Sequence, residues 1–122
     1  MRTLTLVPAV FAILASAGAA SVLAKPWLRL SPNPVKAGHA LSLQGSADGC
    51  PVGDTVFVIS RAFPATHTFA GVSAVLMKVR PGGSFHTSTT IPSMKHPGVY
   101  TVTARCGGGN LGVLVHLHVT SE

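Results

Sequence analysis

His116 and His118, which are separated by Leu117, lie in a segment where apolar and polar residues alternate. Side chains two positions apart in a β-strand share a face and lie about 7 Å from each other. Both imidazoles could therefore bind one Zn²⁺ or Cu²⁺ ion if a neighbouring strand supplied a third ligand. His86 is a candidate if Phe85 points inward. The alternative is a solvated polar face, because structural zinc sites normally use four ligands.

A second candidate binding group lies in the long loop of residues 61–71. It consists of Arg61, Phe63, His67 and Phe69. Two aromatic rings beside an arginine and a histidine could form an exposed patch of the kind that interfaces use. In the alternative, both phenylalanines fold inward and cover the core, because a small domain needs apolar lids. If the rings are exposed, this loop is the candidate binding surface.

Residues suited to catalysis are scarce. The chain has three carboxylates, Asp48, Asp54 and Glu122, so chemistry based on a pair of facing acids has little to use. None of the serines lies in a nucleophile-elbow motif. The glycine-rich segment 105–110 lacks the Gly-Lys-Ser/Thr ending of a phosphate-binding loop, and a hairpin turn is favoured there. We therefore expect neither enzymatic activity nor a cofactor.

The N-terminus accounts for part of the hydrophobic content of 47%. A short basic start, Met1-Arg2-Thr3, precedes an uncharged apolar run from Leu4 to Ala24. This arrangement is typical of a secretory signal peptide, and small residues before Lys25 favour cleavage after Ala24. The sequence thus predicts a helical signal peptide over residues 1–24 and one mature domain over residues 25–122. The alternative is an uncleaved anchor, since the run approaches the roughly 20 residues that span a bilayer.

The basic charge of the predicted mature domain indicates the kind of partner it would attract. Eight Lys and Arg residues against three Asp and Glu residues give it a formal net charge of +5. The cations are spread along the chain and no aromatic stacking platform is apparent, so nucleic acid is not an expected partner. Outside the cell, an anionic cell-wall polymer or an extracellular protein is the more natural partner.

Alternation of apolar residues with a period of two, interrupted by Gly, Pro, Asn and Asp, predicts β-strands and turns along the mature chain. The third strand is apolar at every position from Val56 to Ile59, which predicts a central strand or one buried on both faces. Seven short strands at this spacing favour an antiparallel β-sandwich. The expected strands contain Leu28 and Leu30, Leu41 and Leu43, and residues 55–60, 73–80, 85–91, 98–106 and 112–120.

Two cysteines in an exported chain predict one disulfide, Cys50–Cys106. Every second strand of such a sandwich runs in the same direction, so the second and sixth strands end at the same pole. Cys50 follows the second strand and Cys106 ends the sixth, which agrees with a bond between them. The loops then divide into 46–54, 81–84 and 107–111 at the disulfide pole, and 32–38, 61–72 and 92–97 at the opposite pole.

Four segments carry a resemblance to a known family: residues 28–38, 49–56, 82–85 and 96–106. They resemble bacterial immunoglobulin-like domains of exported Gram-positive proteins, and the similarity spans residues 27–119. The resemblance implies an immunoglobulin-like sandwich in which Tyr100, in Pro-Gly-Val-Tyr-Thr-Val, caps a corner. Unlike antibody domains, the chain has its cysteine six residues after the tyrosine, so the disulfide should join a loop to a strand end.

Members of that family are mostly accessory or adhesive modules, so the resemblance implies a similar role for this protein. The sequence predicts a non-catalytic binding or structural module that is secreted or associated with the cell wall, with an unknown ligand. An extracellular metal-binding protein that uses His116 and His118 is the alternative, and a small secreted enzyme is a second one.

Overall fold

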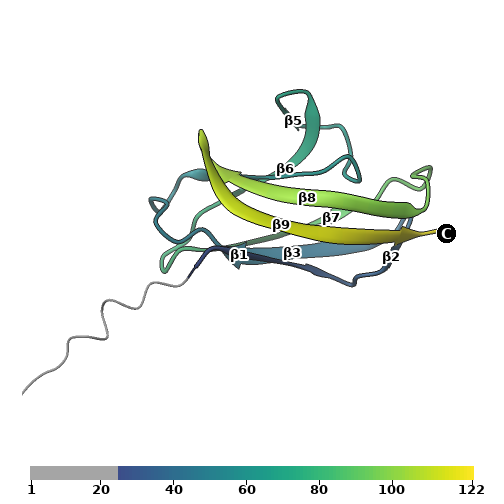
Figure 1. Cartoon of the computed structure of the whole chain (residues 1–122), viewed down its shortest axis with the longest axis horizontal. Coiled ribbons are helices and arrows are strands. Elements are labelled where there is room, and N and C mark those ends of the chain that lie inside the picture. Colours follow the sequence, from purple (N-terminus) through teal and green to yellow (C-terminus); the bar gives the residue numbers. More distant parts are fainter. Residues whose placement is uncertain (1–24) are drawn as a thin grey trace, which may run out of the picture.

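The computed structural model describes residues 25–122, which form an all-β fold of nine strands in two sheets (Figure 1). The predicted signal peptide, residues 1–24, lies outside the described residues. Within residues 25–122 there is no helix long and apolar enough to cross a bilayer. The strands are β1 (Trp27–Ser31), β2 (Val35–Lys36), β3 (Ala40–Ser46), β4 (Thr55–Ile59), β5 (Thr68–Phe69), β6 (Val72–Lys78), β7 (Ser84–Thr90), β8 (Gly98–Cys106) and β9 (Gly109–Thr120).

The two sheets pack face to face as a sandwich (Figure 1). The smaller sheet has the order β1-β3-β7, and both of its pairings are antiparallel. The larger sheet has the order β2-β9-β8-β4-β6-β5, in which β2 pairs with β9 in parallel and the other pairings are antiparallel. The prediction of an all-β sandwich is therefore confirmed at the level of its two sheets.

All seven expected strands are present, and the structure adds two strands of two residues each, β2 and β5. β2 lies inside the segment 32–38, which the sequence predicts as a loop. β8 and β9 meet at a tight turn where Cys106 opposes Gly109, and Gly107 adopts a positive φ of 56°. This is the expected glycine-rich hairpin, and glycine permits that backbone conformation without a steric penalty.

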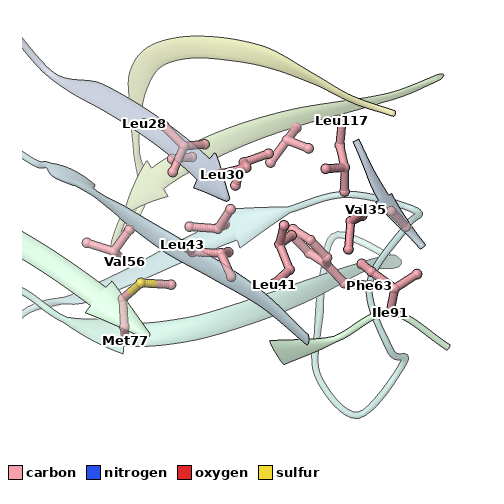
Figure 2. Close-up of a cluster of buried hydrophobic side chains, with 14 of the residues drawn as sticks. Leu28, Leu30, Val35, Leu41, Leu43, Val56, Phe63, Met77, Ile91 and Leu117 are labelled. Carbon is pink, nitrogen blue, oxygen red and sulfur yellow. The ribbon is translucent and has the colours of Figure 1, made fainter. Parts of the chain in front are cut away.

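The core lies between the sheets, where alternate residues of each strand meet (Figure 2). Leu28 and Leu30 of β1 and Leu41 and Leu43 of β3 are buried, while the residues between them are exposed. Because successive side chains of a strand point to opposite faces, this pattern directs the leucines inward. The core has one contiguous cluster, as expected for a small domain.

β4 occupies the centre of the larger sheet, between β8 and β6, which confirms the prediction of a central strand. Val56 and Val58 are buried on its inner face, whereas Phe57 and Ile59 are half-buried on its outer face. Burial on both faces is therefore incomplete.

A glycine allows close packing at the inner face of β3. A Cβ atom added to Gly45 would lie 2.6 Å from Cζ of Phe85 and would also meet the carbonyl oxygen of Trp27. Phe85 is one of the two largest fully buried side chains and fills the space above Gly45. Close contact between β1, β3 and β7 therefore depends on the missing side chain.

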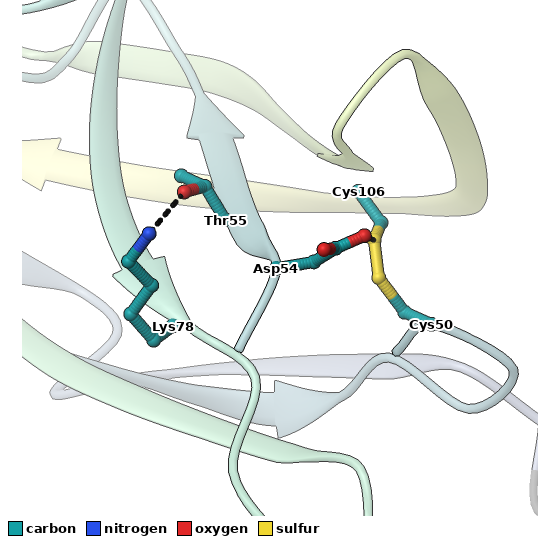
Figure 3. The surroundings of a disulfide bond; sticks show 5 residues. All are labelled: Cys50, Asp54, Thr55, Lys78 and Cys106. Carbon is teal, nitrogen blue, oxygen red and sulfur yellow. Dashed lines mark hydrogen bonds between the residues drawn. A yellow bond between two sulfur atoms is a disulfide. The ribbon is translucent and has the colours of Figure 1, made fainter. Parts of the chain in front are cut away.

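Cys50, in the loop after β3, forms a disulfide with Cys106, the last residue of β8 (Figure 3). Their Cα atoms are 6.4 Å apart, so the bond joins a loop to a strand end, as predicted. At the opposite pole, the hydroxyl of Tyr100 donates a 2.6 Å hydrogen bond to the carbonyl oxygen of His96. This contact joins the side chain of Tyr100 to the backbone four residues upstream.

Candidate functional site

Phe63 is 1% exposed, so the predicted surface that includes this ring is not formed. The local turn gives the reason: the amide of Phe63 donates to the carbonyl oxygen of Ser60, and the amide of Ala62 donates to Ser60 Oγ. This turn directs the chain inward after β4, and the ring packs with Ile91 and Val35 (Figure 2). The alternative in which the loop covers the core is correct for Phe63.

Phe69 takes a different position, half-buried on the outer side of the larger sheet. Its ring centroid lies 5.0 Å from that of Phe57, and the Arg105 guanidinium lies 5.0 Å from the Phe69 centroid. Arg61 and His67 are both exposed. The four predicted surface residues are thus divided between the core, the sheet face and the solvent, and they do not form one patch.

The outer side of the larger sheet carries apolar side chains that the sequence analysis did not single out. Register places Ile59, Thr103 and Leu114 side by side across β4, β8 and β9. Val99 and Thr101 lie on the same face of β8, since residues two apart in a strand share a face. We call these five residues the outer β4–β8–β9 face. Val99 is 60% exposed and Leu114 57% exposed, so apolar surface is available to a partner.

A depression of about 350 Å³ lies on this face. Ile59, Val99, Thr101 and Thr103 are among the residues that line it, together with the exposed Arg61. No carboxylate lines it. The sequence does contain a signal for this face. Val99 and Leu114 occupy outward-facing positions of their strands, where polar residues are expected, and both are apolar.

The acidic residues are found elsewhere. Asp48 and Asp54 line a second depression of about 280 Å³ beside the disulfide. Oδ2 of Asp54 lies 3.9 Å from Sγ of Cys106, and Lys78 Nζ donates a 2.9 Å hydrogen bond to Thr55 Oγ1 nearby (Figure 3). Across residues 25–122, Cys50, Asp54 and Cys106 are the one group of three metal-ligand side chains within 4.8 Å of one another. Because both sulfurs are in the disulfide, neither is a free thiolate.

The structure places His116 and His118 on one face of β9, with both side chains exposed. Leu117 and Val119 point into the core, so the alternation assumed for this strand is correct here. His116 pairs with Thr101 and His118 with Val99 on β8. Both histidines therefore border the outer β4–β8–β9 face, which the sequence did not predict because it does not give the order of strands.

His86 cannot serve as their third ligand. Phe85 does point inward and His86 outward, as expected. However, β7 belongs to the smaller sheet, so His86 faces the opposite side of the sandwich, where its Nε2 contacts the guanidinium of Arg80. Within residues 25–122, no group of three metal-ligand side chains includes His116 or His118.

The architecture defines a class: a two-sheet β-sandwich with one disulfide. No protein-family model and no curated protein matches the chain. A solved structure, the alkylpurine DNA glycosylase AlkC of Pseudomonas fluorescens bound to DNA containing an abasic-site analog, is similar with a TM-score of 0.51 and 17% identity. The match covers 84% of this chain and 32% of the glycosylase chain. At this identity the likeness concerns the fold alone.

Proposed function

We propose that this protein is an exported, non-catalytic immunoglobulin-like module that binds an anionic extracellular or cell-wall partner through the outer β4–β8–β9 face. The observation that carries the proposal is the exposure of Val99 and Leu114 beside the depression. Isolated apolar residues on a protein surface are ordinary, but apolar residues that line a hollow, as Val99 and Ile59 do here, are typical of interaction sites.

Support for the immunoglobulin-like assignment comes from three features together. β2 adds to the edge of β9 in parallel, and the two sheets have the orders β1-β3-β7 and β2-β9-β8-β4-β6-β5. Tyr100 bonds to the backbone four residues upstream, which is the geometry of the tyrosine corner in such domains. The disulfide joins a loop to a strand end and does not cross the core.

The non-catalytic assignment rests on the composition of the depression. Apolar side chains, hydroxyls and one guanidinium line it, and this set offers positioning and hydrogen bonds; the hydroxyl of Tyr100, the one phenol among them, donates to the carbonyl oxygen of His96. An anionic partner fits the excess of cations, including Arg61 at the depression and Arg105 at the end of β8. The DNA-bound glycosylase does not favour DNA as this partner, because a shared fold does not imply a shared function.

Retention of the purified full chain on isolated cell walls, at low and high salt, tests this proposal. Val99→Asp should lower retention by at least about tenfold, because it would bury an unpaired charge against the partner. Ser88→Asp is the matched control: it adds the same charge at an exposed strand position, but on the opposite sheet. We expect it to retain binding.

Two results would contradict the proposal. Equal retention of Val99→Asp and the unchanged chain would remove the outer β4–β8–β9 face from the mechanism. If retention is the same at low and high salt, the partner is not bound through its negative charge, since attraction between exposed charges is screened at high ionic strength. If walls fail to retain the protein and an extracellular protein captures it with the same variant pattern, the face is correct and the partner is a protein.

A further inference from the structure

The two histidines of β9 occupy a segment whose backbone is held from both sides. Asn33 Nδ2 donates a 2.8 Å hydrogen bond to the carbonyl oxygen of His116, and the amide of His118 donates a 2.9 Å bond to Asn33 Oδ1. One side-chain amide thus occupies the place of a neighbouring strand at this edge. On the other side, His116 and His118 pair with Thr101 and Val99 of β8.

This arrangement fixes the positions from which the imidazoles extend. Each side chain is exposed on the same face, about 7 Å from the other along the strand. Pre-organised ligands lose little conformational freedom when they bind an ion, so the hydrogen bonds of Asn33 favour binding without contacting the ion themselves.

We propose that His116 and His118 form a two-histidine site for a divalent transition metal, Cu²⁺ in preference to Zn²⁺. Imidazole suits both ions, and the general order of affinities places Cu²⁺ above Zn²⁺. Two ring nitrogens bind the metal, and water or a group from a partner takes the remaining positions, as in metal sites that keep an open position. This proposal does not rest on the anionic partner, although the two histidines border the face proposed for that partner.

The surroundings set a moderate affinity. Lys36 of β2 pairs with Thr120, which is the next position after His118 on the same face of β9. An ammonium group there repels a cation, and the hydroxyl of Thr101 is the nearest polar side chain on β8 by register. Lys36→Gln should therefore raise metal affinity, which a binding site elsewhere on the chain would not reproduce.

The experiment is a calorimetric titration of the purified full chain with Cu²⁺ alone and with Zn²⁺ alone, joined to an electron paramagnetic resonance spectrum of the Cu²⁺ form. We expect one Cu²⁺ per chain with two nitrogen ligands. His116→Ala and His118→Ala should each weaken binding at least as much as the roughly tenfold that loss of an outer-shell partner costs in other sites. His39→Ala and His86→Ala are matched controls, since both remove exposed histidines outside β9.

Several outcomes would overturn the site. These are the absence of Cu²⁺ binding by the unchanged chain, an equal loss in the His86→Ala control, and unchanged affinity in either β9 variant. Thermal unfolding of each variant shows that the fold is retained, which we expect because both side chains are exposed. Val99→Asp is left out of the metal titrations, because Val99 pairs with His118 and the new carboxylate could itself bind the metal.

Discussion

The two poles of the sandwich are closed by different kinds of interaction. At one pole the Cys50–Cys106 disulfide joins the loop after β3 to the end of β8. At the other, side chains provide the closure: Phe63 and Ile91 are buried, and Tyr100 bonds to the backbone of His96. A covalent bond constrains the chain whatever its packing, whereas a closure made of side chains depends on their fit.

The difference bears on function because the features proposed for binding lie toward the pole that has no disulfide. Ile59, Arg61 and Val99 beside the depression, and His118 on β9, are all closer to that pole along their strands. The exposed binding features therefore lie at the pole that Phe63 helps to close, and the disulfide stabilises them only through the fold as a whole.

Removal of the disulfide should have the largest effect on stability. The bond closes a loop of 56 residues, and in the chain-entropy model Cys50→Ala with Cys106→Ala lowers the free energy of unfolding by about 4 kcal/mol. Guanidinium unfolding measures this, and addition of reductant should then affect the unchanged chain but not the double variant. A loss below about 1 kcal/mol would contradict the contrast between the poles.

Phe63→Ala tests the opposite pole. Because the ring is fully buried, its loss should lower the free energy of unfolding by at least about 3 kcal/mol, as for other buried Phe→Ala changes. Phe69→Ala is the matched control in the same loop, and it should cost less because that ring is half-buried. Equal losses in urea unfolding would mean that Phe63 does not act as the lid of this pole.

Gly45→Ala examines whether packing also matters near the disulfide. The added methyl group must displace Phe85 or the backbone of β1, and overpacking of this kind costs about 2 kcal/mol. Gly108→Ala is the control, because nothing lies within 4 Å of the Cβ position there and its φ is not positive. If thermal unfolding does not distinguish the two variants, the close contact at Gly45 is not required.

Tyr100→Phe should have the smallest effect. It removes the hydroxyl that bonds to His96 and leaves the ring, so the loss should be about 1 kcal/mol, typical of one hydrogen bond. Thermal unfolding in the same buffer as the other variants measures it. A loss as large as that of Phe63→Ala would show that the corner, and not the buried ring, closes this pole.

Much of the fold could be predicted from the sequence, because strands with one buried face alternate in polarity. β8 begins and ends at the predicted residues, and the disulfide agrees with one cysteine in a loop and one at a strand end of the same pole. β2 and β5 could not be predicted, since two residues are too few to show a period.

The candidate site was harder to predict because it depends on strand order and on side chains outside regular strands. Alternation correctly directs His86 outward, but it does not say that β7 belongs to the smaller sheet. The turn at Ser60 directs Phe63 into the core, and the alternation of polar and apolar residues does not indicate such a turn. Val99 and Leu114 departed from alternation, and such departures are the signal that the sequence analysis missed.

The amide of Asn33 also has a consequence for how copies of this protein behave at high concentration. Outer strands of a sheet offer unpaired backbone groups to other chains, and proteins avoid aggregation by covering them. Asn33 and β2 together occupy the backbone groups of β9 from His116 to Thr120. Growth of the larger sheet by addition of another molecule is therefore opposed along this part of β9, which one short proline-flanked segment covers.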